Sequence, residues 1–103
     1  APRRIYWDDS VLDHDARTLT VSGAAISLTG AEFSILTFLV ERSGRAVSRG
    51  QLAEAALPVD GDRFDRTVDS HVARIRRKLG PSGAARIVTV WGIGYRFDAP
   101  EQP

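Results

Sequence analysis

The most informative residues are arginines and small hydroxyl side chains between positions 66 and 78. If this stretch is helical, the step of about 100° per residue places four of them on one face: Arg66, Ser70, Arg74 and Arg77. A guanidinium donates hydrogen bonds to phosphate oxygens and to the O6 and N7 atoms of guanine, and short hydroxyl side chains allow close approach. The pattern indicates a helix that reads a DNA groove. A solvated face on an ordinary amphipathic helix is the alternative.

Other polar residues flank this face. Thr67, His71 and Lys78 continue it on one side, and Arg76 and Asp69 lie beside the apolar residues of the same stretch. Arg76 therefore reaches a phosphate only by extending sideways, and a salt bridge to an acid on a neighbouring element is equally expected. His71 is either a phosphate donor or a half-buried residue of the helix flank.

Charge is distributed unevenly along the 103 residues. The net charge is only +1, but residues 63–80 hold six bases against two acids, whereas residues 5–62 hold four bases against nine acids. Thirteen of the 14 bases are arginine and Lys78 is the one lysine, which favours planar bidentate contacts over simple solubilising charge. A genome rich in guanine and cytosine explains the arginine bias equally well, but it explains the clustering less easily.

Composition excludes several classes of protein. A chain of 103 residues is long enough for one domain, and 43% hydrophobic with 26% charged residues is typical of a soluble globular protein. With no cysteine and two histidines, we expect no metal, no cofactor and no enzymatic activity. No apolar run suits a membrane span or a signal peptide, so we expect a cytoplasmic protein with no membrane partner.

Three other polar patterns favour turns over functional sites. Gly92-Ile93-Gly94 is not followed by a helix, as a nucleotide cradle requires, and His14 has no neighbouring nucleophile. An acidic cluster near the N-terminus lacks the central glycine and terminal glutamate of an EF-hand loop: Asp8, Asp9, Asp13 and Asp15.

The apolar pattern predicts an α+β fold. Runs of β-branched and aromatic residues between turn residues predict a small N-terminal antiparallel meander, with strands at 5–7, 11–12, 17–21 and 25–28. Helical spacing predicts three helices at about 30–42, 49–57 and 66–79. Alternation and a glycine turn predict a C-terminal hairpin, with strands at 86–91 and 95–97.

Local signals set the ends of these helices. Thr29 with Glu32, and Ser48 with Gln51, are capping boxes for the first two helices. The third ends at Gly80-Pro81 and follows a loop-like segment, 57–65, in which either Asp62 or Asp65 is the N-cap. Its apolar seam faces the core: Val68, Val72, Ile75 and Leu79. Two helices, a loop, a basic helix and a hairpin make a winged helix-turn-helix.

These motifs closely resemble the effector domain of OmpR/PhoB-type response regulators. The resemblance covers about residues 5–98 and is carried by Thr29-Gly30-Ala31-Glu32-Phe33, Val47-Ser48-Arg49, Arg66-Thr67-Val68-Asp69-Ser70-His71-Val72, Arg76-Arg77-Lys78-Leu79 and Thr89-Val90-Trp91-Gly92-Ile93-Gly94-Tyr95-Arg96-Phe97. It implies a winged-helix transcription factor domain with an N-terminal four-stranded sheet, a recognition helix at about 66–79 and a wing at about 86–97. Such domains belong to two-component systems and bind direct repeats of duplex DNA as tandem copies.

The resemblance also assigns individual contacts. It implies DNA contacts by Arg66, His71, Arg74, Arg76 and Thr89. Many family members have an arginine, which enters the minor groove, where this chain has Trp91. We therefore expect Trp91 either to lie against the sugar-phosphate backbone or to fold back over the hairpin.

Partners follow from the same resemblance. It implies an upstream phosphorylated receiver domain, which the printed sequence does not include, so we expect residues 1–4 to be a linker remnant and 99–103 a frayed tail. The long loop at 57–65 is either solvated slack or a contact with RNA polymerase, with these candidates: Val59, Asp60, Asp62 and Phe64. A different class of function is a winged-helix module whose basic face docks an acidic protein.

Overall fold

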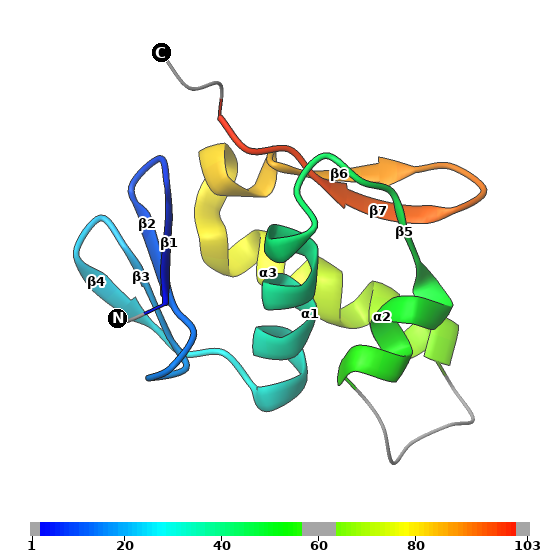
Figure 1. The fold of residues 1–103 in the computed structure, drawn as a ribbon, viewed down its shortest axis with the longest axis horizontal. Helices are drawn as coiled ribbons and strands as arrows, with labels where there is room; N and C mark the ends of the chain where they lie inside the picture. Colours follow the sequence, from blue (N-terminus) through cyan, green and yellow to red (C-terminus); the bar gives the residue numbers. More distant parts are fainter. Residues whose placement is uncertain (1–2, 57–63, 101–103) are drawn as a thin grey trace.

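The computed structural model describes residues 3–56 and 64–100, in which three helices lie between two β-sheets (Figure 1). The elements follow in this order: β1 (Arg4–Trp7), β2 (Ser10–Asp13), β3 (Thr18–Val21), β4 (Ala24–Ile26), α1 (Gly30–Glu41), β5 (Val47–Ser48), α2 (Arg49–Ala56), α3 (Phe64–Ala84), β6 (Ile87–Val90) and β7 (Gly94–Phe97). This is the predicted winged-helix α+β fold. None of the helices in the described ranges is long and apolar enough to cross a membrane.

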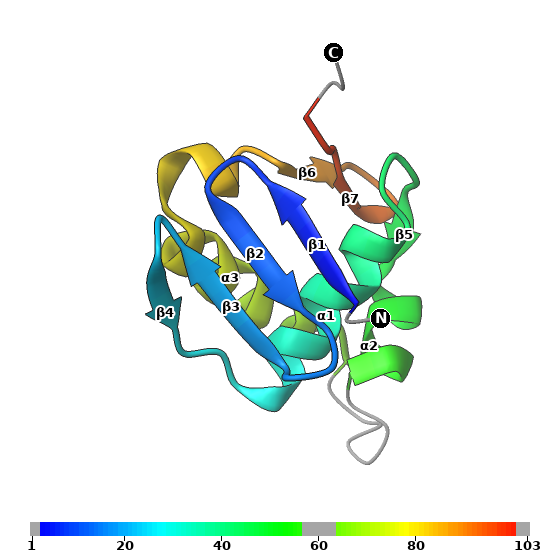
Figure 2. The same ribbon diagram turned by 60° about the vertical axis from the view of Figure 1, so that its left-hand side comes forward.

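The N-terminal sheet is the predicted antiparallel meander, with strand order β1-β2-β3-β4, and it lies across the helices (Figure 2). Trp7, Leu12 and Leu19 point into the core and are at most 3% exposed. The Trp7 ring meets Phe97 of β7 edge-on, with 5.2 Å between the ring centroids. This contact joins the first strand to the last.

The first strand begins one residue earlier than predicted. Arg4 lies opposite Asp13 in the sheet, and its Nε donates a hydrogen bond to Asp13 Oδ2 at 3.1 Å. Arg3 is also engaged, because its carbonyl oxygen accepts a hydrogen bond from the His14 amide at 2.8 Å. Arg3 and Arg4 are therefore hydrogen-bonded to the N-terminal sheet, and the assignment of residues 1–4 to a linker remnant stays a prediction.

Helix α1 is the core helix, and its capping box is present as predicted. The Glu32 amide donates to Thr29 Oγ1 at 3.1 Å, and the Thr29 amide donates to Glu32 Oε1 at 3.0 Å. Phe33, Leu36 and Leu39 are at most 3% exposed. Burial of each such side chain stabilises the fold by about 2 kcal/mol.

Helix α2 begins at the second predicted capping box, where Ser48 and Gln51 exchange backbone-to-side-chain hydrogen bonds of 3.0 Å. The strand just before it, β5, was not predicted, because two residues are too short to show an alternating pattern. It pairs with β7, so Val47 lies opposite Tyr95 and Ser48 opposite Gly94. A Cβ atom on Gly94 would lie 2.1 Å from the Val47 carbonyl oxygen, so this pairing requires a glycine.

Helix α3 starts two residues earlier than predicted. Phe64 and Asp65 are helical rather than part of the loop, so Asp65 lies inside the helix and is not the N-cap. Asp62 lies outside the described residues. The helix breaks at Gly80, with φ 80° and ψ 174°, and a short turn follows it. The predicted seam is at most 3% exposed along its length: Val68, Val72, Ile75 and Leu79.

The C-terminal hairpin forms as predicted and joins a sheet with strand order β5-β7-β6. At its turn the Ile93 amide donates to the Val90 carbonyl at 3.0 Å, and Gly92 has a φ of 83°. That positive φ favours glycine. The hairpin extends beyond the helices as a wing (Figure 1).

Candidate nucleic-acid interface

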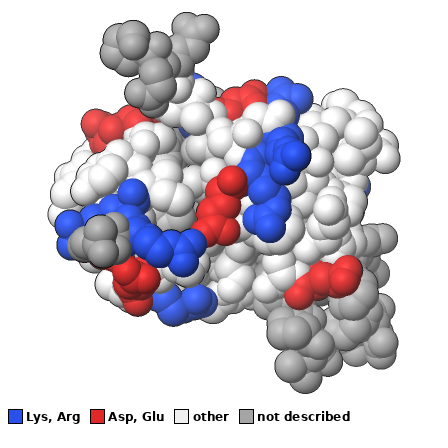
Figure 3. Space-filling model, viewed as in Figure 1, with Lys and Arg blue, Asp and Glu red and all other residues white. Residues whose placement is uncertain are grey.

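The outer face of α3 carries the predicted basic side chains. Ser70, Arg74 and Arg77 are exposed, opposite the buried seam. Arg66 and Thr67 lie on the same helix, but their side chains are outside the described part of the structure. On the face that carries α1, by contrast, basic and acidic side chains lie close together (Figure 3). The outer face of α3 therefore provides exposed donors for an anionic partner.

His71 lies half-buried on the flank of this face. Its Nδ1 atom is 3.4 Å from Nη1 of Arg74. Partial burial and the charge of Arg74 lower the pKa of His71, and the opposing effect of Glu32 is smaller. His71 is therefore neutral at pH 7 and has one N–H group to donate. Its contact with a phosphate stays a prediction.

Lys78 is bound to an acid of α1. Its Nζ lies 2.6 Å from Oε1 of Glu32, which is fully buried. Burial alone would raise the pKa of Glu32. The hydrogen bonds from Lys78 and the Thr29 amide together lower it by more, so the pKa of Glu32 lies below its ordinary value. The Glu32 carboxylate thus caps α1 and also holds the end of α3. The sequence indicated the cap but not its distance from Lys78, and a DNA contact by Lys78 stays a prediction.

Arg76 extends sideways, as its position on the helix requires, but it binds no acid among the described side chains. Its Nη2 donates to the Ile87 carbonyl at 2.7 Å and to Thr89 Oγ1 at 3.0 Å. Its Nε also donates to the Ile87 carbonyl, at 3.3 Å. The expected salt bridge is replaced by hydrogen bonds to β6, because this strand lies beside the flank of α3. Arg76 thus connects α3 to the wing.

A second connection between α3 and the wing is not predicted by the sequence pattern. The Tyr95 hydroxyl donates to Asp69 Oδ1 at 2.6 Å, and Arg49 Nε donates to the same oxygen at 2.8 Å. Partial burial raises the pKa of Asp69, but these two hydrogen bonds lower it below its ordinary value overall. Asp69 is the one acid among the described side chains of α3, and its charge is directed away from the arginine row.

The wing ends in an exposed apolar tip. Trp91 is 88% exposed and Ile93 is 50% exposed. The expectation that Trp91 folds back over the hairpin is wrong, because such packing would bury the ring. Thr89, two residues earlier, is half-buried and accepts the hydrogen bond from Arg76. Trp91 is free to contact a partner.

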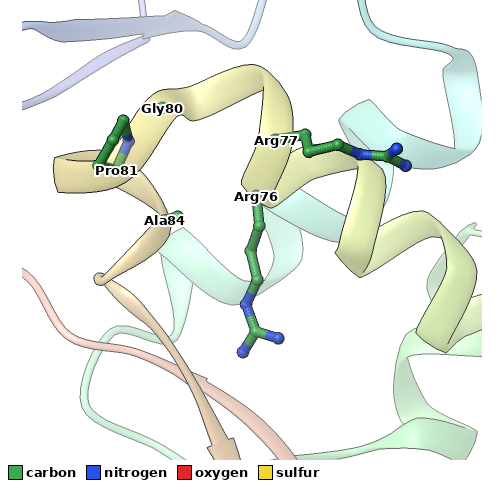
Figure 4. A pocket seen from close by; sticks show the side chains of 5 residues that line it. All are labelled: Arg76, Arg77, Gly80, Pro81 and Ala84. Carbon is green, nitrogen blue, oxygen red and sulfur yellow. The ribbon is translucent and has the colours of Figure 1, made fainter.

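Arg76 and Arg77 both line a shallow hollow of about 380 Å³ near the end of α3, together with Gly80, Pro81 and Ala84. Figure 4 shows that Arg76 extends from the helix toward the strand that follows Ala84, whereas Arg77 extends away from that strand. Arg76 and Arg77 are adjacent in sequence and carry the same charge, but their side chains have different surroundings. Arg76 is directed into the fold, and Arg77 is directed outward.

The remaining predictions have separate outcomes. Asp8 and Asp13 bind Arg86 and Arg4, so these members of the acidic cluster stabilise the fold. The loop positions proposed for RNA polymerase, Val59, Asp60 and Asp62, lie outside the described residues. Phe64 begins α3, and its side chain is not described.

Residues 23–97 match a protein family described as "Transcriptional regulatory protein, C terminal". This chain belongs to that family. The family's transcriptional regulatory protein ResD of Bacillus subtilis is 40% identical over 90 residues, which cover 84% of this chain and 38% of ResD. Across ResD and the next two curated relatives, the chain spans only 38% to 46% of each protein.

Solved structures of family members share the fold. The response regulator DrrB of Thermotoga maritima, described as an OmpR/PhoB homologue, has a TM-score of 0.82 and 34% identity, with 93% of this chain and 44% of DrrB covered. The DNA-binding domain of Klebsiella pneumoniae RstA, solved in complex with the RstA box, has a TM-score of 0.80 and 30% identity, with 93% and 97% covered. The predicted membership of the OmpR/PhoB-type response regulators is confirmed.

Proposed function

We propose that this chain binds duplex DNA in a sequence-specific manner, as the effector domain of a two-component response regulator that controls transcription. Helix α3 lies in the major groove, and the wing approaches the sugar-phosphate backbone and the neighbouring minor groove. The observation that carries the proposal is the exposed arginine row of α3 on the side opposite its buried seam. The related RstA DNA-binding domain is solved in complex with the RstA box, which supports DNA as the partner.

Roles for individual residues follow from their positions. Arg74 and Arg77 are exposed and reach base edges or phosphates, with Ser70 between them as a small donor. Arg66 and Thr67 precede them on the same helix, and His71 donates its single N–H group to a phosphate. At the wing tip, Trp91 packs its ring against the sugar-phosphate backbone and donates its indole N–H. Thr89 contributes its hydroxyl.

The proposal is tested by selecting bound sequences from a random DNA pool and then titrating the selected duplex at several salt concentrations. Each phosphate neutralised by the protein contributes about −0.9 to the slope of log K against log salt. We expect a slope of several units and tighter binding of the selected duplex than of random duplex. Arg77→Ala should reduce the slope by about one. A folded wild-type chain with no selected sequence and a flat slope would instead favour docking to an acidic protein.

We further propose that tandem copies occupy direct repeats in the operator, and that an upstream receiver domain controls their association. The chain alone is then monomeric at micromolar concentration. A constitutive dimerisation module fused at the N-terminus should tighten binding to a two-site operator through effective concentration, by an amount that depends on linker length. A stable dimer of residues 1–103 in light scattering contradicts this proposal.

We also propose RNA polymerase as a partner of the loop between α2 and α3, and the cytoplasm as the place of action. The loop sequence contains two acids, Asp60 and Asp62, in a segment longer than an ordinary helix-turn-helix turn. In transcription from a cognate promoter, Asp60→Asn with Asp62→Asn should leave DNA affinity unchanged and lower transcript yield. An unchanged transcript yield would mean that the loop is a solvated connection without a partner.

A further inference from the structure

Among the described side chains that were predicted to bind DNA, Arg76 is the one that is held by two partners on the wing. Its guanidinium donates to the Ile87 carbonyl and to Thr89 Oγ1, at 2.7 and 3.0 Å from the same nitrogen. β6 is the edge strand of its sheet, so carbonyl oxygens that face away from β7 have no strand partner. Arg76 satisfies one of these oxygens and thereby fastens the edge of the wing to α3.

Tyr95 extends this connection across the sheet. It lies opposite Thr89 in the β6–β7 pair, and the guanidinium carbon of Arg76 lies 5.4 Å from the centroid of its ring. Its hydroxyl is bound by Asp69, seven residues before Arg76 on α3. The helix is thus attached to the hairpin at two points that are about two turns apart. Two attachments fix the direction of the wing relative to the helix, which one attachment cannot do.

The hydrogen bond to Thr89 has a chemical consequence. A threonine hydroxyl has one hydrogen to donate and two lone pairs to accept with. Because Oγ1 of Thr89 accepts from the cationic Arg76, its own hydrogen is free for an outside acceptor, and a charged donor polarises the hydroxyl toward donation. A phosphate oxygen is the acceptor that a duplex offers.

We propose that Arg76 is a positioning residue, which fixes the wing against α3 and orients the Thr89 hydroxyl as the donor to a DNA phosphate. Arg76 itself does not touch DNA. This inference rests on the proposed DNA-binding function and adds that two of its residues act as one unit. Arg77, which is adjacent in sequence and extends in a different direction (Figure 4), is the matched control because the proposed function gives it a direct contact with DNA.

A double-mutant cycle tests the coupling. Affinity for the selected duplex is measured for wild type, Arg76→Ala, Thr89→Val and the double variant, well below the melting temperature of each. We expect each single variant to bind about tenfold more weakly and the double variant to bind no more weakly than either. Thr89→Ser keeps the hydroxyl and should bind within about twofold of wild type. Arg77→Ala combined with Thr89→Val should give losses that multiply.

Positioning is measured directly in the absence of DNA. The chain has no cysteine, so spin labels can be attached at Ala73→Cys on α3 and Ile93→Cys at the wing tip, both exposed positions. We expect one narrow distance distribution with Arg76 present and a broad one in Arg76→Ala. If Arg76→Ala does not fold, Arg76→Lys replaces it in both experiments, because a lysine lacks the planar fork.

The outcomes separate this proposal from the function on which it rests. Multiplying losses for Arg76→Ala and Thr89→Val would mean independent DNA contacts and overturn the proposal, as would undiminished affinity in Arg76→Ala. An unchanged distance distribution also overturns the positioning role. The failure of the wild-type chain to bind any duplex overturns the proposed function itself.

Discussion

The hydroxyl of Tyr95 donates a 2.6 Å hydrogen bond to Oδ1 of Asp69, and it joins the last strand of the fold to the helix with the arginine row. Asp69 also binds Arg49 at the start of α2, so one carboxylate connects three elements. The Asp69 carboxylate therefore binds groups of the protein itself. Its negative charge is compensated by Arg49, so it repels an anionic partner less. The basic character of the α3 face depends on this arrangement.

Tyr95→Phe should lower the free energy of unfolding by about 1–2 kcal/mol at pH 7, because a hydrogen bond to a charged partner is lost. Asp69 has a lowered pKa in the fold, so its contribution is complete above its unfolded pKa, near 3.8, and is lost as pH falls through the folded value. The difference between wild type and Tyr95→Phe should therefore shrink below pH 3.8. Urea unfolding at pH 7 and at pH 3 measures it. Equal stability at pH 7 contradicts a structural role for the hydroxyl.

Arg74→Ala should weaken binding to the selected duplex by about 1–3 kcal/mol and relax preference at one base position. The physical reason is the loss of a bidentate base contact from an exposed guanidinium. Binding to random duplex should change less. Anisotropy titrations with both duplexes give the comparison, and equal losses on the two would make Arg74 a phosphate contact.

Trp91→Arg should steepen the slope of log K against log salt by about one unit and increase affinity for sites with A·T-rich flanks. The ring is 88% exposed, so an arginine at this position places a cation at the wing tip without disturbing the core. Trp91→Ala serves as the control and should weaken binding with an unchanged melting temperature. If Trp91→Ala binds normally, the wing tip does not contact the duplex.

Gly94→Ala should destabilise the domain by about 1–3 kcal/mol, because the added Cβ would meet the Val47 carbonyl oxygen at 2.1 Å. The strain falls on the β5–β7 pair, so DNA binding should weaken along with stability. Gly30→Ala is the matched control, since its Cβ has no neighbour within 4 Å and the backbone is helical. Thermal unfolding of the two variants distinguishes a close approach from a general effect of alanine.

His71 should make the domain less stable in mild acid. Burial and Arg74 lower its pKa in the fold, so the unfolded state binds the proton more readily than the folded state. Stability is therefore unaffected by His71 well above pH 6.5 and falls as the pH decreases from about 6.5 through the folded pKa. His71→Gln should remove this decrease, and His14→Gln should not. Unfolding curves between pH 5 and 8 measure the effect, and a decrease retained in His71→Gln assigns it to other groups.

The sequence predicts those features that depend on local spacing. The seam of α3 is one example, since a period of about 3.6 residues places Val68 and Ile75 on the buried side without knowledge of the rest of the fold. Both capping boxes are also local, because Glu32 follows Thr29 by three positions and Gln51 follows Ser48 by three. Such signals also give the positions of most strands and helices to within one or two residues.

The contacts that decide whether a charged side chain is exposed or bound inside the fold are not local in sequence. Lys78 binds Glu32, which is 46 positions earlier in the chain, and Arg76 binds Ile87 and Thr89 across a break in the helix. The helical wheel gives the direction in which these side chains leave α3 but not the element that they meet. Helical spacing therefore predicts the exposure of Arg74 and Arg77, but it does not predict the partners of Lys78 and Arg76.

The most direct test of the central claim locates the DNA on the protein. Backbone amide spectra are recorded for the labelled chain as the selected duplex is added. We predict that the largest shifts occur in α3 between residues 68 and 78 and in the wing between residues 89 and 93, and that β1 to β4 change little. Shifts concentrated in the N-terminal sheet, with α3 and the wing unaffected, would contradict the claim that the arginine face of α3 binds DNA.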